Sequence, residues 1–85
     1  MDKTVGQIIK EFRAENGISQ TWLAAVINTS LNQVGIRSTY TKGTVCNWEH
    51  DRSLPDRRVV DILSSDDYSS TKIGKLFSAI KEATK

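Results

Sequence analysis

The segment TKGTVCNWEH, from Thr41 to His50, predicts a short amphipathic helix with an unusual outer face. At about 100° per residue, one side collects two large apolar residues and an acid, Val45, Trp48 and Glu49. The other side collects short or polar residues, Gly43, Cys46, Asn47 and His50, with Lys42 at its edge. A solvent-facing side usually carries Glu, Lys, Gln or Ala, which favour the helix. The outer face therefore indicates a helix that lies close against another surface.

Two further helices are predicted on the N-terminal side of this segment. Thr4 and Gln7 form a capping box before a helix with apolar residues at Val5, Ile8, Ile9 and Phe12. Gly17 ends this helix in the left-handed conformation. Ser19 then caps a second helix, and so short a connection predicts that the two helices cross at a steep angle.

The region from Thr29 to Tyr40 allows two interpretations. Leu31 and Val34 continue the helical spacing of Leu23 and Ile27, so we expect the second helix to run on to Gly35. The alternative is a long loop over 29–39 that follows a shorter helix ending at Asn28.

Two more helices are predicted on the C-terminal side. Asp51 ends the third helix, a basic turn follows, and Pro55 is well placed to open a fourth helix. The fifth helix covers about 70–84, is capped near Ser70, and has one apolar stripe, Ile73, Leu76, Phe77 and Ile80. No strand-like alternation occurs, so residues 1–85 are predicted to form a single all-α domain of five helices.

The composition excludes several classes of protein. One cysteine excludes an internal disulfide, and one cysteine with one histidine cannot build a structural zinc site, so we expect no metal and no cofactor. No apolar run could span a bilayer and no secretory leader is present, so a cytoplasmic protein without membrane contact is expected. No paired carboxylates, catalytic triad or phosphate-binding glycine loop indicates an enzyme.

The net charge of +2 is concentrated in one region. Residues 37–58 contain five basic and three acidic residues, whereas the segments before and after are each neutral. An excess of positive charge around the Thr41–His50 segment favours a polyanionic partner. The major groove of DNA admits an α-helix, and an asparagine on such a helix can pair with adenine and a lysine can donate to guanine.

The segments GISQTWLA and TKGTVCNWEHDRSLP together resemble the phage repressor and Cro-type helix-turn-helix family. The matching positions are Ser19, Gln20, Leu23, Ala24, Trp48, Glu49, Arg52 and Pro55. The resemblance covers about residues 5–63. It implies a sequence-specific double-stranded DNA-binding regulator of transcription, a repressor, that docks its third helix in the major groove and binds as a homodimer. For a phage-encoded protein, the compartment would be the host-cell cytoplasm.

The resemblance also implies roles for individual residues. Base contacts would come from Lys42, Gly43 and Asn47, and DNA backbone contacts from Gln20, Thr41, Thr44, Arg52 and Ser53. Arg13 and Glu49 would form a structural ion pair between the first and third helices.

The chain departs from the family in two places. About eleven residues are inserted between the second and third helices, within 29–40, and this insertion could add DNA contacts from Arg37, Ser38 and Tyr40. Asp51 stands where many family members have glycine. Two alternatives remain: an antitoxin-type DNA-binding protein, and a module that binds a protein partner and has lost DNA readout.

Overall fold

The computed structural model describes residues 3–84, which fold entirely into helices and connections. The helices are α1 (Val5–Asn16), α2 (Gln20–Gln33), α3 (Lys42–Glu49), α4 (Arg57–Leu63) and α5 (Lys72–Ala83), with a short 3₁₀ helix at Asp66–Tyr68. The described part of the chain contains no strand. The predicted all-α class with five α-helices is confirmed.

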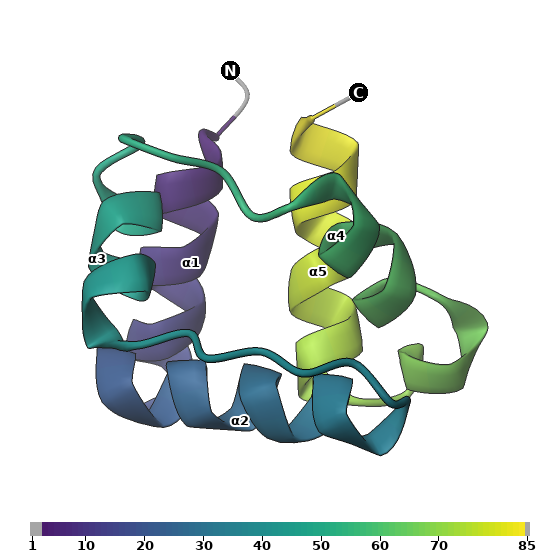
Figure 1. The fold of residues 1–85 in the computed structure, drawn as a ribbon. Helices are drawn as coiled ribbons and strands as arrows, with labels where there is room; N and C mark the ends of the chain where they lie inside the picture. The colour runs from purple at the N-terminus through teal and green to yellow at the C-terminus, as the bar shows by residue number, and fades with distance from the viewer. Residues whose placement is uncertain (1–2, 85) are drawn as a thin grey trace.

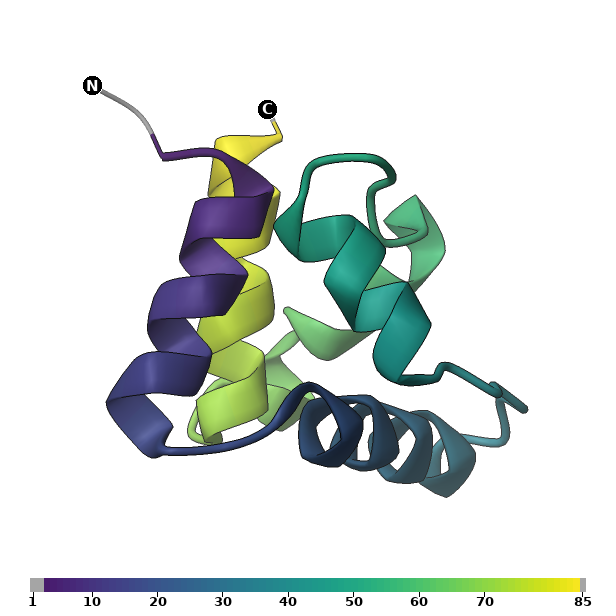
Figure 2. The same ribbon diagram turned by 90° about the vertical axis from the view of Figure 1, so that its left-hand side faces the viewer.

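The helices form two groups that α2 joins (Figure 1). α1 and α3 lie side by side in one group, α4 and α5 pack together in the other, and α1 also packs against α5. α1 and α5 run in opposite directions, and α2 crosses beneath them, with α3 rising from its N-terminal half (Figures 1 and 2). The steep angle expected between the first two helices is present.

The core is formed by apolar side chains from all five helices. Its largest fully buried members are Phe77, Ile9, Leu23, Ile27, Leu31, Leu63, Ile80 and Val45. Trp48 is 3% exposed and anchors α3 to this core. The residues that the helical spacing placed on the inner side of α3 are therefore the buried ones, and the outer side faces solvent.

The helix starts follow the prediction for α1, α2 and α5 but not for α4. The amide of Gln7 donates to Thr4 Oγ1, and the amide of Thr4 donates to Gln7 Oε1, which completes the capping box. The predicted start of α4 was wrong. Pro55 lies before the first turn of α4, because the Asp56 side chain accepts from the amide of Arg58 and is the true N-cap. α5 is capped by Thr71, whose hydroxyl accepts from the amide of Gly74, next to the predicted position at Ser70.

Three helices end in the same way, with a residue in the left-handed region. Gly17 (φ 63°), Gly35 (φ 80°) and Asp51 (φ 55°) follow α1, α2 and α3. In each case the next amide donates to a carbonyl five residues back, which satisfies the last turn of the helix. Glycine adopts this conformation without strain, whereas Asp51 must be compensated by other contacts.

The chain between α2 and α3 is longer than a tight turn because α2 is extended and the chain then doubles back. α2 runs to Gln33, so the longer-helix interpretation is confirmed and the loop over 29–39 is wrong. After Gly35 the chain returns along α2 to the start of α3 (Figure 1). The extra residues thus project beyond the α2–α3 crossing and leave α3 packed on α2.

Gly6 allows α1 and α3 to approach each other closely. A Cβ at this position would lie 2.5 Å from the carbonyl oxygen of Glu49 and 2.9 Å from that of Trp48, both backbone atoms. Only glycine fits between these backbones without a shift. The position of α3 relative to α1 is therefore set at a backbone contact.

Candidate nucleic-acid interface

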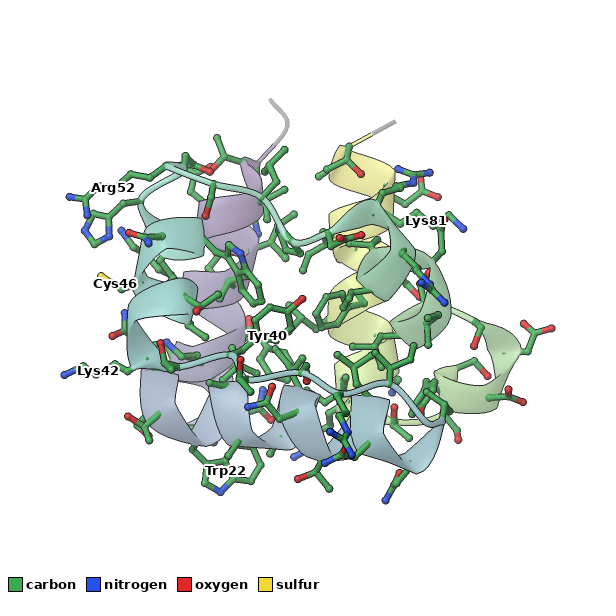
Figure 3. The ribbon with its side chains drawn as sticks, viewed as in Figure 1. Trp22, Tyr40, Lys42, Cys46, Arg52 and Lys81 are labelled. Carbon is green, nitrogen blue, oxygen red and sulfur yellow. The ribbon has the colours of Figure 1, made fainter. Side chains whose placement is uncertain are left out.

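The outer face of α3 is exposed and carries the predicted base-contacting residues. Lys42, Gly43 and Asn47 are all exposed, and neither the Lys42 nor the Asn47 side chain bonds another described residue. Lys42, Cys46 and Arg52 project from the same side of the molecule (Figure 3). The face combines one flexible cation, a gap at the glycine and one amide, a set of groups able to meet base edges.

The acidic residues near this face are turned away from it. Glu49 is 4% exposed and lies under α3. The Asp51 carboxylate accepts from the amide of Gly6 and from the hydroxyl of Thr4, each at 3.0 Å, at the N-terminus of α1. A carboxylate is favoured at a helix N-terminus, and these bonds compensate its left-handed backbone. The outer face therefore keeps the positive charges of Lys42 and Arg52 without a nearby acid bonded to either.

Glu49 is the centre of a buried network that joins three helices. Its carboxylate pairs with Nε of Arg13, and it also accepts from Arg13 at 2.9 Å and from the Gln20 side chain at 3.0 Å. The ion pair expected between Arg13 and Glu49 is thus present. Burial acts to raise the pKa of Glu49, but the hydrogen bonds from Arg13 and Gln20, together with the charges of Arg13 and Lys10, outweigh burial and lower it.

The lowered pKa of Glu49 predicts an acid-dependent loss of stability that Glu49→Gln removes. A carboxylate with a lowered folded-state pKa stabilises the fold above its unfolded pKa and loses this contribution as the pH falls through the folded value. We expect wild type to be more stable than Glu49→Gln at neutral pH. The two free energies of unfolding should converge below pH 4.5, the ordinary pKa of a glutamate side chain. Urea denaturation at a series of pH values measures the free energy of unfolding of each protein. A difference that stays constant with pH would contradict the prediction.

Gln20 does not have the free side chain that the resemblance implied. Its amide nitrogen donates to Glu49 inside the network, and the residue is half-buried. Its principal role in this structure is to hold the start of α2 on the end of α3. A phosphate contact stays a prediction for the second N–H of the same amide group, because a phosphate oxygen can only accept.

The other predicted backbone-contacting residues lie at the two ends of α3. Thr41 and Thr44 are close to each other, since the amide of Thr41 donates to Thr44 Oγ1 at 3.3 Å. At the far end, Arg52 and Ser53 are exposed in the turn after α3. The amide of Arg52 donates to the carbonyl of Asn47, so the Arg52 side chain, rather than its amide, is available to a partner.

The inserted segment contributes fewer free groups than the sequence suggested. Ser38 Oγ donates to Asn28 Oδ1 at 2.7 Å, and the ring of Tyr40 packs edge-on against Trp48 with centroids 5.2 Å apart. Tyr40 points between the helices (Figure 3), where burial, aided by the charge of Asp56, raises its pKa. Both side chains thus have partners within the chain, and their DNA contacts stay predictions. Arg37 is exposed and bonded to no described residue.

Sequence reasoning missed the residue that holds this segment. Asn28, on α2, accepts from the amide of Tyr40 at 3.0 Å and donates to its carbonyl at 2.9 Å, in addition to the bond from Ser38. An asparagine inside a predicted helix is a weak signal that its amide is needed elsewhere. Asn28 thereby fixes the segment that leads into α3.

Within residues 3–84, no group of three or more His, Cys, Asp or Glu side chains lies close enough to hold a metal ion. None of the helices in this range has both the length and the apolar character needed to cross a membrane.

Comparison of the chain with models of known protein families, with curated proteins and with solved structures gave no match.

Proposed function

We propose that this protein is a helix-turn-helix regulator that binds double-stranded DNA sequence-specifically and represses transcription. In this proposal α2 and α3 form the helix-turn-helix unit, with an extended second helix and a returning connection in place of the tight turn. α3 is the recognition helix. The resemblance of its sequence to the phage repressor and Cro-type family points the same way.

The outer face of α3 carries the proposal. Gly43 leaves room for close approach, while Lys42 and Asn47 supply exposed groups that base edges can accept or pair with. The inner face is held by the buried Trp48 and by the Glu49 network. A recognition helix needs both an accessible outer face and a firmly packed inner face, because contacts to bases demand a surface that is held rigidly in place.

The proposed mechanism divides the contacts into two kinds. Asn47 pairs with adenine and Lys42 donates to guanine in the major groove. Arg52, at the end of α3, contacts phosphate and fixes the register without reading sequence. Occupation of a promoter by the docked protein would then exclude the transcription machinery.

The proposal predicts different losses for Asn47→Ala and Arg52→Ala. Asn47→Ala should weaken binding to the preferred duplex by about 1–3 kcal/mol and relax preference at one base pair. Arg52→Ala should weaken all duplexes about equally and reduce the salt slope by about 1. Selection from a random duplex pool at near-physiological salt identifies the preferred site, and fluorescence anisotropy then measures the affinities.

Lys72→Ala is the matched control, because Lys72 is an exposed lysine on α5 rather than on α3. It should leave preference unchanged. Selection that enriches no motif from wild type, or an Asn47→Ala variant with unchanged affinity and preference, would contradict the proposed recognition by α3.

A protein-interaction module is the second candidate, and Trp22 favours it. This tryptophan is 52% exposed on α2 and points away from the helical bundle (Figure 3). Exposed tryptophans are frequent anchors of protein interfaces. Weak DNA binding that hardly changes with salt would support this candidate over the first, because phosphate contacts make DNA binding steeply salt-dependent.

A further inference from the structure

Cys46 and His50 lie side by side on the outer face of α3. Residues four apart on a helix are neighbours, and Sγ of Cys46 lies 3.6 Å from Nδ1 of the His50 ring. His50 is exposed, and Cys46 is half-buried with its sulfur on the outer side of the helix (Figure 3). Thiolate and imidazole are ligands that zinc and copper ions prefer. The pair therefore presents two metal-binding groups together at an open surface.

The distance between the two atoms matches an ion of the size of zinc. A thiolate sulfur binds zinc at about 2.3 Å and a histidine nitrogen at about 2.0–2.1 Å. At the tetrahedral angle of about 109°, these bond lengths put the sulfur and the nitrogen about 3.5–3.6 Å apart. The observed separation of Cys46 Sγ and His50 Nδ1 is 3.6 Å. The two ligands thus already stand at the spacing that a tetrahedral ion requires.

The position of the pair at the end of α3 also favours a cation. His50 follows the last residue of α3, where the carbonyl groups carry the negative end of the helix dipole. Nδ1 of His50 lies 2.8 Å from the carbonyl oxygen of Cys46, which can only accept, so Nδ1 carries a hydrogen here. When a metal ion binds at Nδ1, the ring hydrogen moves to Nε2 and the thiol proton of Cys46 passes to the solvent.

Two protein ligands make an exchangeable site and not a structural one. A structural zinc site uses four protein ligands, and within residues 3–84 no third His, Cys, Asp or Glu joins this pair. The acid that follows His50 in the chain, Asp51, is bonded instead to Thr4 and to the amide of Gly6. Water must therefore complete the coordination, and the ion can enter and leave from the solvent side.

We propose that Cys46 and His50 together bind one exchangeable divalent metal ion of the zinc class on the outer face of α3. The ion projects from the surface that also carries Gly43 and Asn47. Under the proposed function this surface meets base edges, so the bound ion and DNA compete for it. The competition rests on the proposed function, whereas the metal site does not.

Titration of the reduced protein with Co²⁺ tests the site without DNA. Cobalt substitutes for zinc at sulfur and nitrogen ligands, and a cysteine thiolate bound to it gives a charge-transfer absorption band. The chain has one cysteine and one histidine, so such a band can come only from Cys46. The band should saturate at one ion per chain and disappear when Zn²⁺ is added. Cys46→Ser should abolish the band, and His50→Ala should weaken binding by at least about tenfold.

The double variant His50→Ala with Asn32→His is the matched control. It keeps one cysteine and one histidine but moves the histidine to an exposed position in the C-terminal half of α2, whereas α3 rises from the N-terminal half (Figure 1). It should bind Co²⁺ as weakly as His50→Ala, and far-ultraviolet circular dichroism checks that every variant is folded.

Three results would overturn the metal site. They are a wild-type protein that gives no band, one ion bound per two chains, and a double variant that binds Co²⁺ as tightly as wild type. The competition has its own test, in which Zn²⁺ should weaken binding of the preferred duplex by wild type at least tenfold more than by Cys46→Ser. An equal effect on both proteins, with the cobalt band present, would overturn the competition and leave the site standing.

Discussion

Arg13→Ala should destabilise the fold by about 3–5 kcal/mol, because it leaves a buried carboxylate without its cation. The side chain of Glu49 is only 2% exposed. After the substitution its described hydrogen-bond partner is the Gln20 amide alone, which is neutral. Urea denaturation at neutral pH measures the loss, and it should appear in the free energy of unfolding rather than in the denaturant slope.

Lys3→Ala is the matched control for this prediction. This substitution also breaks an ion pair between a basic residue and a glutamate, since Lys3 Nζ lies 2.6 Å from Glu11 Oε2. Here, however, both side chains are about half exposed. Its cost should be far smaller than that of Arg13→Ala, because solvent screens an exposed pair. The double variant Arg13→Met with Glu49→Leu should recover most of the stability, since no buried charge remains. If Arg13→Ala costs no more than Lys3→Ala, the network contributes little.

Gly6→Ala should destabilise the fold by about 2–3 kcal/mol and displace α3. The added methyl group would meet two backbone carbonyl oxygens of α3, those of Glu49 and Trp48, at 2.9 Å or less. Backbone atoms cannot rotate away as the end of a side chain can, so the two helices must separate. The same separation would weaken the bond from the Gly6 amide to Asp51. Thermal or urea unfolding measures the loss.

Gly43→Ala is the control that separates the steric clash at Gly6 from the effect of alanine on helix propensity. A methyl group there would have Thr41 Oγ1 as its nearest neighbour, at an ordinary 3.6 Å. Alanine is favoured over glycine inside a helix, so this variant should stabilise the fold by about 0.5–1 kcal/mol. Equal effects of the two substitutions would show that α1 and α3 are not in tight contact. If α3 reads DNA, Gly43→Ala should lose affinity despite its greater stability.

The sequence predicted the parts of the fold that local chemistry determines. Thr4, Ser19 and Gly17 mark helix ends through bonds to residues within a few positions, and the inner face of α3 follows from periodicity alone. The error at Pro55 arose because Asp56, the next residue, has a carboxylate that accepts from the amide of Arg58, whereas a proline side chain has no acceptor. The Arg13–Glu49 pair required the family resemblance, because its members are 36 positions apart.

The contacts that sequence reasoning missed join distant segments. Nothing in the pattern around Asp51 indicates that its carboxylate binds the start of α1, 45 residues away along the chain. Tyr40 was predicted as a possible DNA contact, and nothing in the sequence indicates that the return of the chain along α2 places its ring on Trp48. Such contacts depend on the path of the whole chain, and a single sequence carries no signal for them.

The doubled-back connection after α2 makes chain length at this point independent of the geometry of α3. Asn28 holds the end of the connection at Tyr40, and the amide of Ile36 is bonded to the carbonyl of Leu31 at its beginning. Residues added at the exposed Gly35 would therefore lengthen the projecting end of the α2–α3 connection and would not move a helix. Each doubling of such a loop costs only about 0.6 kcal/mol in closure entropy. The chain around Gly35 is accordingly the natural place in the molecule for an inserted sensor or tag.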